Sequence, residues 1–119
     1  MAIDNSEFKK ALARFVTGVT VVSTKDDDTC YGITINSFSS VSLEPPLILY
    51  CLDKRSSVHD VFVHTESFVV NILSQDQLYL AEHFACQDKT DWTGAPHIIG
   101  NHGIPVIRDA VAAIECRQH

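Results

Sequence analysis

The chain has 119 residues, of which 45% are apolar and 20% are charged; this composition suits a single globular core and excludes a disordered chain. Nine Lys and Arg residues against 15 Asp and Glu residues leave a formal charge of −6. The basic residues are scattered, which argues against binding to nucleic acid or to anionic membranes, because phosphate contacts need clustered cations.

The first predicted element is a helix around Phe8–Phe15, because apolar residues recur there at helical spacing after a pair of residues with capping-box spacing. β-Branched residues then predict a strand over 19–24, and a return strand over 29–35 completes a hairpin across an acidic turn. The next strand is predicted over 47–52. Its residues are apolar, as expected of a strand in the core. It follows a Pro-Pro pair, which lacks the N–H groups that strand pairing needs.

A short helix is predicted over 58–63, with Ser57 as its N-cap, followed by a strong strand over 68–73. A capping box at Ser74 and Gln77 opens a longer helix through about Phe84. The residues on its apolar face are Leu78, Ala81 and Phe84.

The last third of the chain begins with a polar, turn-rich segment over 87–102, which predicts a long surface loop. Two short strands are predicted after it, over 104–107 and 111–116. Five or six strands with a few short helices indicate a small barrel with helical covers. A doubly wound α/β sheet would need a helix after nearly every strand, and the pattern lacks this alternation.

The four cysteines, at positions 30, 51, 86 and 116, indicate neither a zinc site nor a disulfide framework, because none lies close to another. We expect reduced and mostly buried thiols and no bound metal. The first residues lack the basic and apolar regions of an export signal, and no apolar run approaches the ~20 residues of a membrane-spanning helix. A cytoplasmic protein is therefore expected.

Two polar segments flank the 47–52 strand, one over 34–40 and the other over 53–57. Their hydroxyls and main-chain donors suit the edge of a polar heterocycle and a phosphate. Ser56 and Ser57 also precede a helix N-terminus, where free N–H groups and the dipole favour an anion. The glycine-rich loops typical of nucleotide sites are absent. On the residues alone, turn and cap roles remain open beside a ligand-binding role.

Several sequence blocks carry more specific information, and they occur in this order: F-x-x-A-x-x-x-F-x-T-G-V-x-V-V from Phe8, G-x-T-x-N-S-F-x-S-V-S-L-x-P-P-L from Gly32, F-V-V-N-I-L from Phe68, Q-x-x-L-A-x-x-F-A from Gln77 and G-x-P-V from Gly103. Together they resemble the flavin reductase family, the small reductases of two-component flavin monooxygenases. The resemblance covers nearly the whole chain.

The resemblance implies a mainly β fold, an FMN-binding split β-barrel of Greek-key type with a few short flanking helices, formed by residues 1–119 as one domain. It implies a homodimer that binds FMN or FAD near the subunit interface and transfers a hydride to the flavin from NADH or NADPH. The reduced flavin would pass to a partner monooxygenase. Family members usually continue past the Glu115-Cys116 strand, so this chain is expected to lack their final strands.

Carried over by position, the resemblance implies three groups of cofactor-binding residues. The isoalloxazine ring and ribityl chain would meet Thr34, Ile35, Asn36, Ser37 and Ser40, together with Cys51, Leu52 and Asp53. The phosphate would meet Ser56 and Ser57, helped by Lys54 or Arg55. The flavin tail or the nicotinamide nucleotide would meet Phe84, Ala85, Gln87 and Lys89. No catalytic acid or base is expected, because the cofactors carry the hydride chemistry themselves.

Some alternatives stay open. The chain is either an active reductase, a non-catalytic flavin-binding or electron-carrier domain, or a truncated inactive fragment. Trp92 either covers the active site or packs a long loop, and Cys51 either touches the flavin or lies in the core. For Asn71, within a strand, a structural hydrogen bond is favoured over a flavin contact. The histidines lack metal-site spacing and are expected at the surface or at helix caps.

Overall fold

The computed structural model describes residues 19–35, 38–44, 46–86 and 88–118, although for 38–43 and for Pro46 it describes only the main chain. The predicted helix around Phe8–Phe15 lies outside the described residues. So do three of the predicted cofactor-binding residues, Asn36, Ser37 and Gln87.

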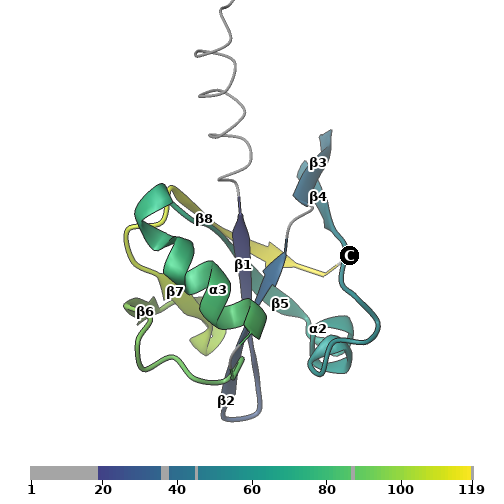
Figure 1. Cartoon of the computed structure of the whole chain (residues 1–119). Coiled ribbons are helices and arrows are strands. Elements are labelled where there is room, and N and C mark those ends of the chain that lie inside the picture. The colour runs from purple at the N-terminus through teal and green to yellow at the C-terminus, as the bar shows by residue number, and fades with distance from the viewer. Residues whose placement is uncertain (1–18, 36–37, 45, 87, 119) are drawn as a thin grey trace, which may run out of the picture.

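The centre of the fold is a four-stranded antiparallel sheet with the strand order β2-β1-β5-β8 (Figure 1). Its strands are β1 (Thr20–Asp26), β2 (Thr29–Ile35), β5 (Ser67–Ile72) and β8 (Ala112–Arg117). All four were predicted within two residues of these bounds. The β1–β2 hairpin turns at Asp27, whose φ of 53° lies in the left-handed region that a short acidic side chain tolerates.

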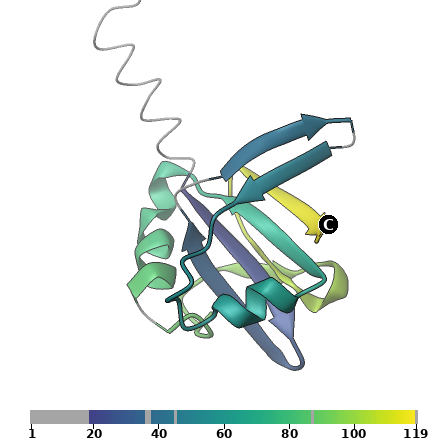
Figure 2. The same cartoon turned by 90° about the vertical axis from the view of Figure 1, so that its right-hand side faces the viewer.

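Each face of this sheet carries its own apolar cluster, because successive side chains of a strand point to opposite faces. Val21 packs in the first cluster, beneath the helix α3 (Leu78–Cys86), whereas Val22 packs in the second, with the helix α2 (His59–His64). Figures 1 and 2 show the two helices on opposite sides of β1. No helix in the described part of the chain is long and apolar enough to cross a membrane.

The predicted capping box before α3 is confirmed. The Ser74 main-chain N–H donates to Gln77 Oε1 at 3.1 Å, and the box opens a 3₁₀ turn, η1 (Gln75–Gln77), which leads into the helix. The predicted apolar face is wrong at Leu78, which is 47% exposed. Gln77 takes the first position of the buried stripe instead, because its side-chain amide donates to the Arg108 carbonyl at 2.5 Å. The stripe continues through Leu80, Ala81 and Phe84.

The short helix α2 begins one residue later than predicted, and its N-cap is Val58 rather than Ser57. A tight turn precedes it, in which the Ser56 N–H donates to the Asp53 carbonyl at 3.0 Å. This turn brings the Ser56 hydroxyl to 3.4 Å from the Val58 N–H, while Ser57 stays exposed. The predicted Ser57 cap is therefore wrong.

A two-stranded ribbon projects from the body of the molecule (Figure 2). It pairs β3 (Phe38–Leu43), a serine-rich strand that was not predicted, with β4 (Pro46–Tyr50). The prediction that the apolar strand lies in the core is wrong, because Leu49 is 55% exposed and its neighbours in β4 are only partly buried. The ribbon instead lays one apolar side against the second cluster, which Ile48 and Tyr50 contact.

The segment predicted as a surface loop over 87–102 is partly core. Trp92 and Ala95 are buried in the first cluster, and the strand β6 (His97–Ile99) pairs with β7 (Pro105–Ile107). The 3₁₀ turn η2 (Asn101–Gly103) joins these two strands. The described residues thus form eight strands rather than five or six, and the mainly β class is confirmed.

The favoured structural role of Asn71 is confirmed. Its side chain is fully buried within β5, where its amide donates to the Val21 carbonyl at 2.9 Å and to the Ser23 hydroxyl at 3.1 Å. Its Oδ1 accepts from the Ile107 N–H at 3.0 Å. One side chain therefore connects the central sheet to β7.

Candidate functional site

The strand β2 carries two of the predicted ring contacts, Thr34 and Ile35, at its C-terminal end. The Gly32 main-chain N–H points away from β1 and donates to the Lys89 carbonyl at 2.8 Å. In an antiparallel pair, every second residue turns its main-chain groups outward. Thr34, two residues farther on, therefore presents its N–H and C=O at this outer edge, and no described main-chain group pairs with them there.

Close packing of α3 and Trp92 on β2 requires a glycine at position 32. A Cβ atom there would lie 2.8 Å from two ring carbons of Phe84 and 2.9 Å from the ring of Trp92. The two rings contact each other with centroids 4.6 Å apart, and the Trp92 indole N–H donates to the Cys30 carbonyl at 3.2 Å. Trp92 therefore packs in the first cluster, which confirms the packing alternative. A glycine within a strand, as at position 32, is the sequence signal of such a close approach.

The side chains of several predicted ring and tail contacts are occupied by the fold itself. The Thr34 hydroxyl donates to the Ala81 carbonyl at 2.5 Å, and the side chains of Ile35 and Phe84 are buried in the second and first clusters. Ala85 is exposed, and the Lys89 ammonium donates to its carbonyl at 3.4 Å. Around this edge, the groups left for a ligand are the main chain of Thr34 and the surface of Ala85 and Lys89.

The predicted phosphate contacts lie in the loop between β4 and α2. Asp53 accepts from the Arg55 main-chain N–H at 2.8 Å and from its guanidinium at 3.2 and 3.3 Å. These hydrogen bonds from Arg55 hold the pKa of the Asp53 carboxyl below its usual value. Lys54 and Ser57 are exposed, and Ser56 is partly exposed. The loop thus offers hydroxyls and a free ammonium, while the guanidinium is already paired.

The structure brings the candidate residues together in two groups rather than one. The first group, on the α3 side of β2, holds Thr34, Phe84, Ala85 and Lys89. The second group is the loop with Cys51, Leu52, Asp53, Lys54, Ser56 and Ser57, which leads into α2 on the other side of the sheet (Figure 1). Ser40 belongs to β3, opposite Ile48 of β4, and Cys51 is exposed rather than in the core.

An apolar groove of about 600 Å³ runs between β4 and β8. Its floor is formed by Phe62 and Phe68, and the exposed side chains of Leu49, Val63 and Ile114 form part of its walls. Tyr50 also lines the groove, with its ring edge-on to Phe68 at a centroid distance of 5.4 Å. Burial, followed by the charge of nearby Cys116, raises the pKa of Tyr50 to about 12.

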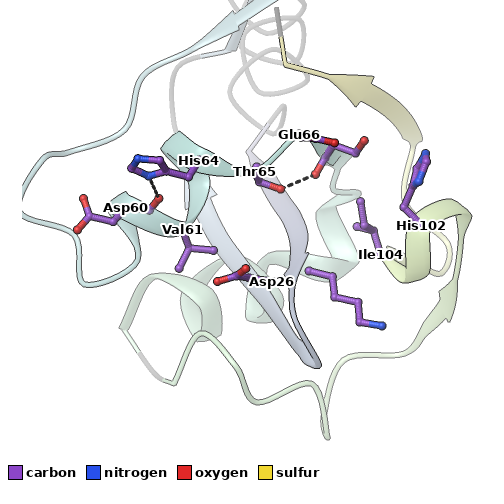
Figure 3. A pocket seen from close by; sticks show the side chains of 10 residues that line it. Asp26, Asp60, Val61, His64, Thr65, Glu66, His102 and Ile104 are labelled. Atoms are coloured by element: carbon purple, nitrogen blue, oxygen red, sulfur yellow. Dashed lines mark hydrogen bonds between the residues drawn. The ribbon is translucent and has the colours of Figure 1, made fainter.

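A second hollow, of about 560 Å³, is polar and shares no residue with the predicted cofactor site (Figure 3). His64, Glu66 and His102 line it, and the His64 Nδ1 lies 2.8 Å from the Asp60 carbonyl oxygen. Its mixture of acidic and basic side chains does not match a phosphate. Among the described residues, no three metal-ligating side chains converge on a common point.

All four cysteines are free, but the prediction that they are mostly buried is wrong. Cys51 and Cys86 are exposed, and Cys30 and Cys116 are partly exposed. Cys30 still packs against the first cluster and Cys116 against the second.

Comparison with known proteins places these features in a family. The family described as flavin reductase like domain matches residues 12–119. An FMN reductase (NADH) from Agrobacterium fabrum is 40% identical over 97% of the chain, and the reductase subunit of a flavin-dependent monooxygenase from Rhodococcus jostii is 35% identical over 97%. A solved structure of a Streptomyces globisporus NADH:FAD oxidoreductase, in complex with NAD and FAD fragments, matches the whole chain with a TM-score of 0.79 and 33% identity.

The chain spans 66% and 59% of the length of these two curated relatives, and it covers 74% of the solved oxidoreductase. The structural match, together with sheets that do not close in the described residues, confirms the predicted split-barrel fold.

Proposed function

The chain belongs to the flavin reductase-like domain family, and on this premise we propose that it is an NAD(P)H-dependent flavin reductase. It would transfer a hydride from NADH or NADPH to FMN or FAD. The observation that carries the proposal is the structural match along the whole chain to an NADH:FAD oxidoreductase in complex with NAD and FAD fragments.

The ring of the flavin would meet the outer edge of β2. The main-chain N–H and C=O of Thr34 form a donor and an acceptor side by side, and the pyrimidine edge of an isoalloxazine ring carries the complementary acceptor and donor. The close packing of Gly32 against Phe84 and Trp92 supports this edge. Rigid main-chain donors are what stabilises negative charge developing on a ring without reorganisation.

The phosphate would lie at the loop between β4 and α2. Ser56 and Ser57 supply hydroxyls there, and Lys54 supplies an exposed ammonium. The six-residue helix α2 is short, so hydroxyls and charge are expected to contribute more than its dipole. Ala85, in the last turn of α3, and Lys89, three residues beyond the helix, would meet the flavin tail or the nicotinamide nucleotide.

The task of the protein is to position the reactants. A bound flavin accepts the hydride itself, so the chain needs no acid or base at the reacting atoms. Holding two reactants in a reactive geometry lowers a barrier by several kcal/mol, up to ~7–11 kcal/mol in well-oriented systems. The edge of β2 would hold the flavin ring in place. Ala85 and Lys89 would align the nicotinamide nucleotide that stacks on that ring.

The proposal includes two partners. A monooxygenase component would receive the reduced flavin, since a relative 35% identical to the chain is a reductase subunit of such an enzyme. A second copy of the chain would cover the groove between β4 and β8, where Leu49, Val63 and Ile114 are exposed, since exposed apolar patches favour association. Light scattering on the purified protein, with a mass of 13.2 kDa per chain, tests the homodimer directly.

The test of the activity is anaerobic mixing of the protein and FMN or FAD with NADH or NADPH. Catalytic bleaching of the oxidised flavin band at about 450 nm supports a reductase. A flavin that binds but stays oxidised with both nucleotides contradicts it and leaves a binding domain. Free flavin with each nucleotide, without protein, is the control for the uncatalysed reaction.

A further inference from the structure

Three hydrogen bonds join β2 to α3 and to the chain that follows this helix. They occur at every second residue of the strand. The Cys30 carbonyl accepts from the Trp92 indole at 3.2 Å, and the Gly32 N–H donates to the Lys89 carbonyl at 2.8 Å. The Thr34 hydroxyl donates to the Ala81 carbonyl at 2.5 Å. The first two bonds use main-chain groups of β2, and only the third depends on the identity of a β2 side chain.

The third bond lies within the first group of candidate residues, between β2 and α3. Thr34 carries the outward main-chain groups proposed to meet the flavin ring, and Ala81 lies one helical turn before Ala85 in α3. The surroundings of Thr34 on this face are apolar, since Val21, Ala81 and Phe84 belong to the first cluster. A valine has nearly the same shape and would fill the position equally well. What the threonine adds is its hydroxyl, which makes a directional hydrogen bond to the Ala81 carbonyl of α3.

We propose that Thr34 is a positioning residue: its hydroxyl holds the end of α3 in register with the free edge of β2. This inference rests on the proposed flavin reductase function. Without the bond, α3 stays attached through Gly32 and Trp92 but loses its fixed distance from the edge at Thr34. The surface of Ala85 and Lys89 then no longer meets the bound nucleotide at a constant geometry.

If the Thr34 hydroxyl had a purely structural role, its loss would lower stability without changing flavin binding or kcat. Thr24 offers the comparison, because its hydroxyl donates to the Ser67 carbonyl at 2.8 Å and also bonds the Thr65 hydroxyl, at the far end of β1 from the candidate site. Thr24 is fully buried, so its loss should destabilise the fold at least as much as the loss of the Thr34 hydroxyl.

The experiment compares Thr34→Val, Thr34→Ser and Thr24→Val with the unmodified protein. Flavin affinity is measured by fluorescence titration, kcat and KM for NADH by steady-state assay, and Tm by thermal unfolding. We expect Thr34→Val to weaken flavin binding by up to about tenfold and to lower kcat at saturating flavin, because the free energy of the lost hydrogen bond is the upper limit of what positioning can contribute. Thr34→Ser should restore both to within about twofold, since it keeps the hydroxyl. Thr24→Val should lower Tm alone.

The result that overturns the proposal is a Thr34→Val protein with unchanged flavin affinity and kcat and a lowered Tm, as for Thr24→Val. Thr34→Ala, which removes the same hydroxyl without a new methyl contact to α3, decides the question if the valine variant does not fold. If the unmodified protein itself neither binds nor reduces flavin, the proposed function fails, and the positioning role fails with it. If the unmodified protein is active and the variants equal it, only the positioning role fails.

Discussion

The main chain of Gly32 lies directly against the ring of Phe84, so closely that a Cβ atom at Gly32 would lie 2.8 Å from two ring carbons. Phe84 is fully buried, and the contact joins α3 to the edge strand of the sheet. We expect Gly32→Ala to lower the free energy of unfolding by about 1–3 kcal/mol, the usual cost of overpacking a core, as measured by denaturant unfolding.

The matched control is Gly94→Ala, because a Cβ at Gly94 would meet nothing within 4 Å. This variant should change stability by no more than about 0.5 kcal/mol. Equal stabilities for the two variants would contradict the tight packing of β2 against α3.

Asn71 tests the buried polar link between the central sheet and β7. Asn71→Ala leaves the buried Ile107 N–H without its partner, which costs about 1–3 kcal/mol, and it removes the amide's hydrogen bonds to the Val21 carbonyl and the Ser23 hydroxyl. We expect a large loss of stability in denaturant unfolding. Asn101→Ala, at an exposed asparagine that bonds Glu115, should cost no more than about 0.5 kcal/mol. A harmless Asn71→Ala would mean that water or another side chain replaces the amide.

A negative charge at Ser57 tests the proposed phosphate contact. Ser57→Asp should weaken flavin binding roughly fivefold, because two exposed charges about 4 Å apart repel by about 1 kcal/mol in water. The effect should shrink as salt is added. Gln75→Glu adds the same charge at an exposed position of η1 and should leave the affinity unchanged. Equal affinities for Ser57→Asp and the unmodified protein would remove Ser57 from the site.

Tyr50 makes the stability depend on pH in the alkaline range. Because its pKa rises from about 10 to about 12 on folding, mainly through burial, the folded chain keeps a proton that the unfolded chain loses between these values. The stabilising contribution is therefore complete below pH 10 and is lost as the pH rises toward 12. The free energy of unfolding should fall across this window.

The measurement is denaturant unfolding at several alkaline pH values, together with an absorbance titration of the three tyrosines. Tyr50→Phe should flatten the fall in stability and remove the last tyrosine to ionise. Tyr79→Phe, at an exposed position of α3, should leave that last step in place. A last step that persists in Tyr50→Phe would show that Tyr50 is accessible to water.

The sequence predicted the central sheet well, because β-branched runs and a capping box are local signals. It missed β3, whose serines carry no strand pattern and which pairs with β4. It also misjudged β4, since an apolar strand in a ribbon and an apolar strand in a core have the same composition. The buried Trp92 depends on the space above Gly32, which only the folded chain defines.

The candidate site could be predicted in part. The family resemblance indicated the right segments, but sequence position does not tell whether a residue binds through its side chain or its main chain. The Thr34 hydroxyl and the side chains of Ile35 and Phe84 are used by the fold, and only hydrogen-bond partners and burial reveal this. The outward direction of the Thr34 main chain follows from the pairing register, which a single sequence does not determine.

The most direct test of the account is a crystal structure of the protein grown with FMN or FAD. We predict the polar edge of the ring at the Thr34 main chain and the phosphate beside Ser56 and Ser57. A flavin in the hollow lined by His64 and His102, or a candidate site filled by the protein's own side chains, would contradict the assignment.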